Sequence, residues 1–257
     1  MNKIIVYLVV SLSLFIFGCA SKPSITIEPG LITVNGTNYI SNTLTIDPGT
    51  RVVFKELPEG FVIDPTSGAP GKLIITNGGR LVAIGTKEKP INFVAESKFS
   101  AIVFISGNQG SILQYCDFSG FDSIDINDSI TMKYCKVETY INFNISAPAI
   151  IQYNTLNTHF PINITNAVNF QYNDVVATIE INGISVPSSF PTIRNNNIYS
   201  GLSLAINNLC TSSITVSSNY IHDSNGKTGV DIDGSQSYNT KYDSPQISPI
   251  ASAGCGW

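Results

Sequence analysis

Residues 151–156 read IQYNTL, and nineteen residues later residues 170–175 read FQYNDV. The shared pattern is an apolar residue, any residue, Tyr or a small polar residue, Asn or Cys, any residue, and an apolar residue. It occurs six times, and its fourth positions, the ladder positions, are Cys116, Cys135, Asn154, Asn173, Asn196 and Asn219. Their spacings of 19, 19, 19, 23 and 23 residues indicate a solenoid in which each repeat stacks on the next.

Pairs of apolar residues two apart recur eight and ten residues after the ladder positions. They are Ile124 and Ile126, Phe143 and Ile145, Ile162 and Ile164, and Leu204 and Ile206, and the coil after Asn173 is expected to shift its pair to Ile184 and Val186. Such alternation predicts short strands with one buried face. No segment keeps helical spacing, and turns rich in Asn, Ser, Gly and Pro separate the pairs. The sequence therefore predicts an all-β chain.

This repeat resembles the right-handed parallel β-helix of the pectin-lyase-like superfamily, whose asparagine ladder lies at a sharp bend once per coil. The resemblance implies one solenoid of about nine coils over residues 25–240, with 19–23 residues per coil in the regular part. Asn suits such a bend because it tolerates left-handed backbone, and its amide can donate to its counterpart about 4.8 Å away. Cys116 and Cys135 depart from Asn, and we expect that bond to be lost there.

The amino-terminal half carries two further signs of the same fold. Residues 79–93, GRLVAIGTKEKPINF, resemble a signature of bacterial surface β-helix proteins, in which Leu81 and Ala83 point inward. TIEPG at residues 26–30 recurs as TIDPG at residues 45–49, again 19 residues apart.

The amino terminus gives the expected cellular address. Lys3 precedes an apolar run over residues 4–17, which is too short to span a bilayer comfortably and predicts a signal peptide over residues 1–18. The sequence IFGC at residues 16–19 resembles a bacterial lipobox, which implies that Cys19 is lipidated, that residues 19–24 form a tether, and that the membrane is a partner. Ala20 favours the outer membrane by the same analogy. The alternative is an ordinary secretory signal with a chance Gly-Cys.

Composition excludes some partners. Charged residues make up only 12% of the chain and the net charge is −4, so no basic stripe is available for nucleic acid. A surface of Asn, Ser, Thr and Tyr instead suits hydroxyl-rich or protein partners.

Four cysteines follow Cys19. Cys116 and Cys135 lie on adjacent coils, and either free thiols or a disulfide are possible there, with parallel side chains favouring thiols. We expect a disulfide between Cys210 and Cys255, which would attach residues 241–257 to a late coil as a cap.

Tyr115, Tyr134, Tyr153 and Tyr172 form a second ladder beside the first. Facing outward, they would form an aromatic strip for sugars or a partner. Two-residue parity with Leu113 favours the inward alternative, unless the bend intervenes.

The chain shows no strong catalytic pattern. The motifs of polysaccharide-cleaving enzymes with this fold are missing, and the expected outward row of Asp125, Asn144, Asn163, Ser185 and Ala205 holds one acid and no base. Asp223, Asp231 and Asp233 could hold Ca²⁺ with oxygen ligands, or be solvated turn residues. The prediction is a non-catalytic envelope lipoprotein that binds glycan or protein or serves structurally, and the alternative is a divergent polysaccharide lyase or glycoside hydrolase using Asp231 and Asp233.

Overall fold

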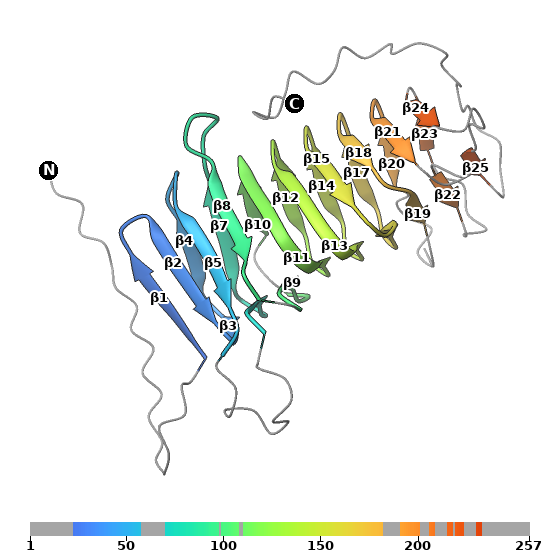
Figure 1. The fold of residues 1–257 in the computed structure, drawn as a ribbon. Coiled ribbons are helices and arrows are strands. Elements are labelled where there is room, and N and C mark those ends of the chain that lie inside the picture. Colours follow the sequence, from blue (N-terminus) through green and yellow to red (C-terminus); the bar gives the residue numbers. More distant parts are fainter. Residues whose placement is uncertain are drawn as a thin grey trace, which may run out of the picture.

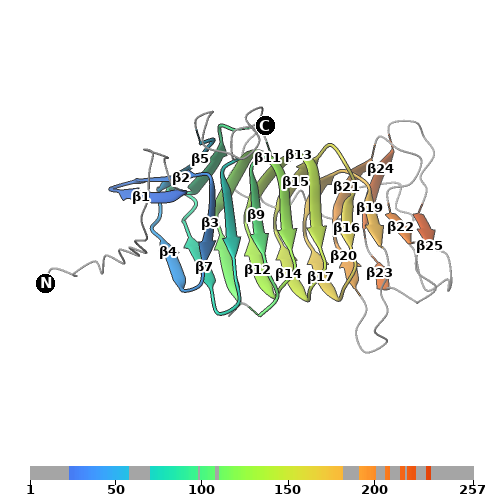
Figure 2. The same cartoon turned by 90° about the horizontal axis from the view of Figure 1, so that it is seen from below.

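The fold consists of strands alone in the part of the chain that the computed structural model describes. That part comprises residues 23–57, 70–97, 99–107, 110–181, 191–200, 206–208, 215–217, 219–223 and 230–232. Apart from β1 (Ser24–Glu28), its strands form three columns in which each strand pairs in parallel with the strand one coil along. Figures 1 and 2 show the coils following one another from β2, β3 and β4 at one end to β24 and β25 at the other. The prediction of an all-β chain of stacked parallel coils is confirmed for these residues.

The first column follows the ladder positions along the chain. It contains β2 (Leu31–Asn35), β5 (Arg51–Lys55), β8 (Ile91–Ala95), the first halves of β11 (Cys116–Ile126) and β13 (Lys136–Ile145), β15 (Thr155–Thr158), β18 (Asp174–Val176), β21 (Asn197–Ser200) and β24 (Tyr220–Asp223). Asp117, Lys136, Thr155, Asp174 and Asn197 lie in one register along it.

The second column carries the predicted apolar pairs. It contains β3 (Thr37–Ile40), β6 (Lys72–Ile75), β9 (Ala101–Phe104), the second halves of β11 and β13, β16 (Ile162–Ile164), β19 (Ile179–Ile181), β22 (Ile206–Asn208) and β25 (Val230–Ile232). Ile124, Phe143 and Ile162 pair in register and are at most 1% exposed, which confirms that they face inward.

The third column closes each coil. It contains β4 (Thr43–Ile46), β7 (Arg80–Ile84), β10 (Ser111–Gln114), β12 (Ile130–Lys133), β14 (Ala149–Gln152), β17 (Val168–Gln171), β20 (Thr192–Arg194) and β23 (Thr215–Ser217). Leu81 and Ala83 of β7 are both fully buried, as the sequence predicts.

The core fills the space between the three columns with stacked apolar side chains. Phe93 and Phe118, one coil apart, stack with their ring centroids 4.7 Å apart. Phe121 meets Phe54 edge to face at 4.9 Å. Each such pair adds about 0.5–1.5 kcal/mol beyond the area it buries. Because every coil contributes equivalent inward residues, the core is a continuous rod along the solenoid.

The structure corrects two predicted apolar pairs. The coil after Asn173 places Ile179 and Ile181 opposite Ile162 and Ile164, not Ile184 and Val186. The next coil places Ile206 opposite Ile179, so the pair predicted at Leu204 and Ile206 is also out of register. The corner before β19 is two residues shorter than the corner before β16, since Ile179 lies six residues after Asn173 and Ile162 lies eight after Asn154.

The TIEPG and TIDPG copies do not occupy equivalent places. Residues 24–28 form β1 (Ser24–Glu28), which runs antiparallel to β2, whereas the second copy begins with the last two residues of β4, which runs parallel to β7. The nineteen-residue spacing therefore does not mark a further coil at the amino-terminal end.

Candidate functional site

The most regular polar feature lies on the outer face of the second column. Asp125, Asn144, Asn163 and Glu180, here called the outer row, stand one per coil in register between buried apolar neighbours. All four are half-buried. The shorter corner before β19 is what brings Glu180 into this row, where the sequence predicted Ser185.

The outer row is held by its own hydrogen bonds. Asn144 Nδ2 donates to Asp125 Oδ1 at 2.7 Å, and Asn163 Nδ2 donates to Asn144 Oδ1 at 2.9 Å. Ser123 Oγ donates to Asp125 Oδ2 at 3.0 Å. An Asn amide has two N–H donors and an oxygen with two lone pairs, so Asn144 keeps one donor and one lone pair for an outside group. These planar groups are therefore fixed in orientation before any ligand arrives.

The backbone register continues the outer row beyond Glu180. Asn207 of β22 pairs with Glu180, and Asp231 of β25 pairs with Asn207. The sequence predicted Ala205 in place of Asn207 and no second acid. The extended row therefore has acids at its two ends and in its middle, separated by Asn.

The separations of the acids bear on their chemistry. At about 4.8 Å per coil, Asp125 and Glu180 are about 14 Å apart, and Glu180 and Asp231 are about 10 Å apart along the column. Inverting glycosidases hold their carboxyl groups about 6.5–9.5 Å apart and retaining ones about 5–5.5 Å. Only the Glu180–Asp231 spacing comes near either range.

The ladder amides are buried and hydrogen-bonded to the neighbouring coils. Asn173 is 0% exposed; its Nδ2 donates to Ile151 O and Asn196 Oδ1, and its Oδ1 accepts from the backbone N and Nδ2 of Asn154. The same amide-to-amide bond joins Asn196 to Asn219 at 2.9 Å. Asn173 and Asn196 have no capacity left for a ligand, so their role is structural.

The bend itself does not use the ladder residues. The left-handed backbone falls one position earlier, on Tyr115, Tyr134, Tyr153 and Tyr172, with φ between 49° and 59°, and on Asn195. The explanation of the ladder by the left-handed tolerance of Asn is therefore wrong. Asn is required at the next position because an inward amide bonds both neighbouring coils.

The tyrosines are half-buried rather than enclosed in the core. Their left-handed backbone breaks the two-residue parity, so the inward alternative is wrong. Successive rings stack nearly parallel, with centroids 4.9, 5.1 and 5.0 Å apart. Because each ring covers the face of the next, the strip offers ring edges rather than faces, which does not suit stacking against sugar rings along its length.

The two ladder cysteines are buried and free. Burial raises the pKa of the Cys116 thiol well above its ordinary value, and the neighbouring Cys135 raises it further. Cys116 Sγ donates to Ala83 O and Cys135 Sγ to Lys133 O. The backbone N of Cys135 still donates to Asn154 Oδ1 at 2.9 Å, so this rung keeps part of the ladder. Buried structural thiols of this kind are inert.

The other predicted sites lie partly or wholly outside the described residues. Cys19, Cys210, Cys255 and Asp233 are outside them. Asp223 ends β24 opposite Ser200, and Asp231 lies in β25. The described residues contain no cluster of three metal-ligating side chains, and none of their segments is a helix long and apolar enough to cross a membrane.

A second outward row, on the first column, carries two carboxyl groups with altered acidity. Burial raises the pKa of Asp117, and Lys136 on the next coil opposes the rise. Burial also raises the pKa of Asp174, against a 2.6 Å hydrogen bond from Asn197 Nδ2. Asp117 and Asp174 are three coils apart, about 14 Å, so they cannot act as a pair.

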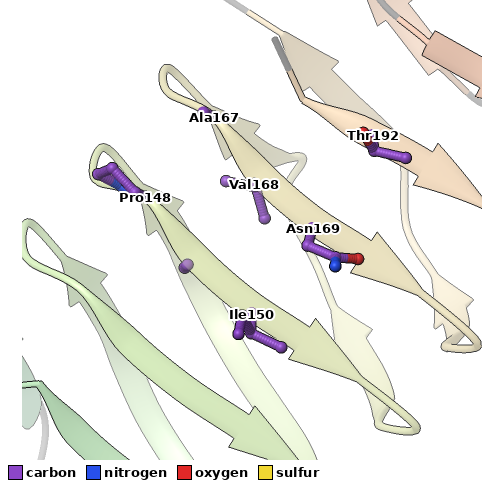
Figure 3. Close-up of a pocket in the computed structure, with 7 residues that line it drawn as sticks. Pro148, Ile150, Ala167, Val168, Asn169 and Thr192 are labelled. Atoms are coloured by element: carbon purple, nitrogen blue, oxygen red, sulfur yellow. The ribbon is translucent and has the colours of Figure 1, made fainter. Parts of the chain in front are cut away.

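A shallow pocket of about 420 Å³ lies on the third column. Figure 3 shows Ile150 and Asn169 on adjacent strands of this pocket, with Thr192 beyond them. Its lining is Pro148, Ala149, Ile150, Ala167, Val168, Asn169 and Thr192. None of these side chains is an acid or a base, so the pocket has no catalytic chemistry.

No protein family, no curated protein and no solved structure matches this chain.

Proposed function

We propose that this chain is a non-catalytic, lipid-anchored protein of the bacterial cell envelope that binds an extended, hydroxyl-rich glycan along its outer row. We also propose that its coils form a right-handed, pectin-lyase-like β-helix of about nine turns. The parallel columns and the repeated amide bonds support this fold. The observation that carries the function is the hydrogen-bonded line of Asp125, Asn144 and Asn163 on one exposed sheet face.

A glycan is favoured by the chemistry of the outer row. Each Asn presents one remaining donor and one remaining acceptor, and a sugar hydroxyl both donates and accepts. Asn144 and Asn163 repeat this pattern on two adjacent coils, so two successive units of a hydroxyl-bearing chain can make equivalent contacts. Asp125 and Glu180 make the outer row acidic, which favours neutral hydroxyls over a polyanionic polymer.

A binding screen tests this function. Residues 20–257 would be measured against neutral and acidic polysaccharides by affinity electrophoresis and calorimetry. The double variant Asn144→Ala/Asn163→Ala should lose about tenfold or more in affinity, since two bidentate contacts are removed. Asn169→Ala, on the third column, is the matched control and should bind as the unchanged chain does. Equal binding by all three proteins would refute the outer row as the site.

Glycoside hydrolysis is the second candidate, and one observation favours it. The register places Glu180 and Asp231 in one row with a single residue, Asn207, between them. Their separation of about 10 Å is just above that of inverting enzymes. Reducing ends released by the unchanged chain, but not by Glu180→Gln or Asp231→Asn, would establish this activity.

The lipid anchor has its own test. Cys19→Ala should release the protein from the membrane fraction, because acyl chains on Cys19 hold it there. Metabolic labelling with a fatty-acid analogue should mark the unchanged chain alone. Labelling of both proteins, or of neither, would contradict lipidation at Cys19.

A further inference from the structure

The amino-terminal end of the solenoid is incompletely closed. β3 pairs only with β6, and β4 only with β7, among the described strands. β1 covers the first coil only along β2, in antiparallel pairing. Figures 1 and 2 show β1 to β4 together at this end of the stack. Within the described residues, Ile32 and Val34 of β2 are covered, but no strand covers the outer edges of β3 and β4, although a solenoid end needs a cap.

Apolar side chains collect at this open end, which we define by Ile25, Ile27, Ile40 and Leu44. Ile25, Ile40 and Leu44 pack against the core and are half-buried. Ile27, which pairs with the buried Ile32, is 60% exposed. Tyr39, next to Ile40 but on the outward face of β3, is 67% exposed. The exposed apolar surface thus lies where the chain enters the solenoid.

The chain length before β1 indicates what covers the open end. Ser24, the first residue of β1, is five residues from Cys19, and five extended residues span at most about 18 Å. A lipidated Cys19 lies at the membrane surface, so β1 and the first coil must lie close to the lipid headgroups. Tyr is favoured in that interfacial layer, and apolar side chains reach about 5–10 Å into it.

We propose that the open end docks on the lipid bilayer, with Ile27 and Tyr39 in the interface and the solenoid axis directed away from the membrane. This inference rests on the lipid anchoring proposed above. The bilayer completes the cap that β1 begins. The charges near this end are mixed, with Glu28 on β1 in register with Arg51 two strands along on β5, so the docking depends on apolar burial rather than on anionic lipid.

A fluorescence experiment tests the docking without relying on acylation. Residues up to Cys19 are replaced by a hexahistidine segment, and the protein is held on phosphatidylcholine vesicles that contain nickel-chelating lipid and brominated acyl chains. Trp257, the single native Trp, is replaced by Phe. One reporter is then introduced in each protein: Ile27→Trp, Tyr39→Trp, or the control Phe160→Trp. Phe160 is 53% exposed and lies between β15 and β16.

The expected result is strong quenching by brominated lipid at positions 27 and 39 and little at position 160. Similar quenching at all three positions, or none at 27 and 39, would overturn the docking. Because the open end carries reporters at two positions in separate proteins, misfolding of one variant still leaves the other to test the docking. A dimer in solution is the other outcome that would overturn the proposal. It would show a doubled molecular mass and a shift of the emission from the reporter at position 27 without vesicles, and it would assign the open end to a second copy of the chain. Failure of Cys19 acylation in cells would leave this result unchanged, so the two proposals fail separately.

Discussion

At the scale of single residues, the buried ladder amides stabilise the fold by bonding in two directions. Asn173 accepts two hydrogen bonds from Asn154 and donates to Ile151 O and Asn196 Oδ1. One such hydrogen bond contributes about 1 kcal/mol net to the free energy of unfolding, but a buried partner left without its bond costs about 1–3 kcal/mol. Removing the amide leaves several partners unsatisfied at once.

Asn173→Ala should therefore lower the free energy of unfolding by about 3 kcal/mol or more. Denaturant unfolding followed by circular dichroism measures it. The reverse substitution at a cysteine rung, Cys135→Asn, adds an amide beside Asn154 Oδ1 and should be neutral or stabilising by up to about 1 kcal/mol. A loss below about 1 kcal/mol for Asn173→Ala would contradict this account of the ladder.

Tyr153 shows how a residue in left-handed backbone is retained. Its φ is 59°, and its ring stacks on both Tyr134 and Tyr172. Tyr153→Asn keeps a side chain that tolerates this backbone, as Asn195 does two coils further along, and should cost about 1–3 kcal/mol for two lost stacks. Tyr153→Val should cost clearly more, because β-branched residues are strained there. Thermal unfolding of the two variants compares them, and equal losses would exclude the backbone argument.

Asp174 predicts a pH dependence of stability. Burial raises the pKa of its carboxyl above the ordinary value of 3.8, so the folded protein binds a proton more readily than the unfolded chain. Its contribution to stability is thus greatest below pH 3.8 and is lost as the pH rises through the folded pKa.

Asp174→Asn should remove this contribution, and the difference in unfolding free energy between the two proteins should change between pH 3.8 and the folded pKa. Stability of the variant relative to the native chain should rise as the pH rises through that window. Unfolding titrations at fixed salt measure this difference. If the difference in unfolding free energy stays constant from pH 3 to pH 7, the pKa of Asp174 is not raised by folding.

At the scale of elements, the corners decide which residues share a face. The sequence placed the inward residues of β11, β13 and β16 correctly, because their nineteen-residue period is unbroken. The sequence-based prediction was wrong at β19. The corner before this strand is two residues shorter than the corner before β16, so the extra residues of this 23-residue coil do not lie in that corner. The alternation of Ile179, Glu180 and Ile181 carried the missed signal, since an isolated acid between two Ile predicts an outward position.

Gly85 tests the corner between the third and first columns. A Cβ at Gly85 would lie 2.6 Å from the backbone O of Tyr115 and 3.0 Å from that of Lys89, so the corner has no room for a side chain. Gly85→Ala should cost about 2–3 kcal/mol because backbone atoms must move. Gly110→Ala is the control, since its φ of 71° is strained for Ala but its Cβ would meet nothing within 4 Å, and it should cost about 1 kcal/mol. Chemical unfolding of both variants gives the comparison.

At the scale of the whole molecule, repetition makes the fold predictable and the site difficult to predict. Each coil repeats the same inward residues, so a few spacings in the sequence suffice to predict stacked parallel coils. The outward residues are free to vary, and their meaning depends on which of them share a register. One shift at β19 was enough to hide Glu180 and Asn207 from the outer row. The outward position of the tyrosines was missed because the two-residue alternation of a strand does not hold through a left-handed bend.

Size-exclusion chromatography with light scattering tests the central claim, that the outer row binds a glycan without cutting it. Residues 20–257 and a polysaccharide selected by the binding screen are incubated and separated together. The account predicts co-elution of protein with polysaccharide, an unchanged polysaccharide mass after prolonged incubation, and loss of co-elution for Asn144→Ala/Asn163→Ala. A fall in polysaccharide mass that Glu180→Gln abolishes, or co-elution that survives the double substitution, would contradict it.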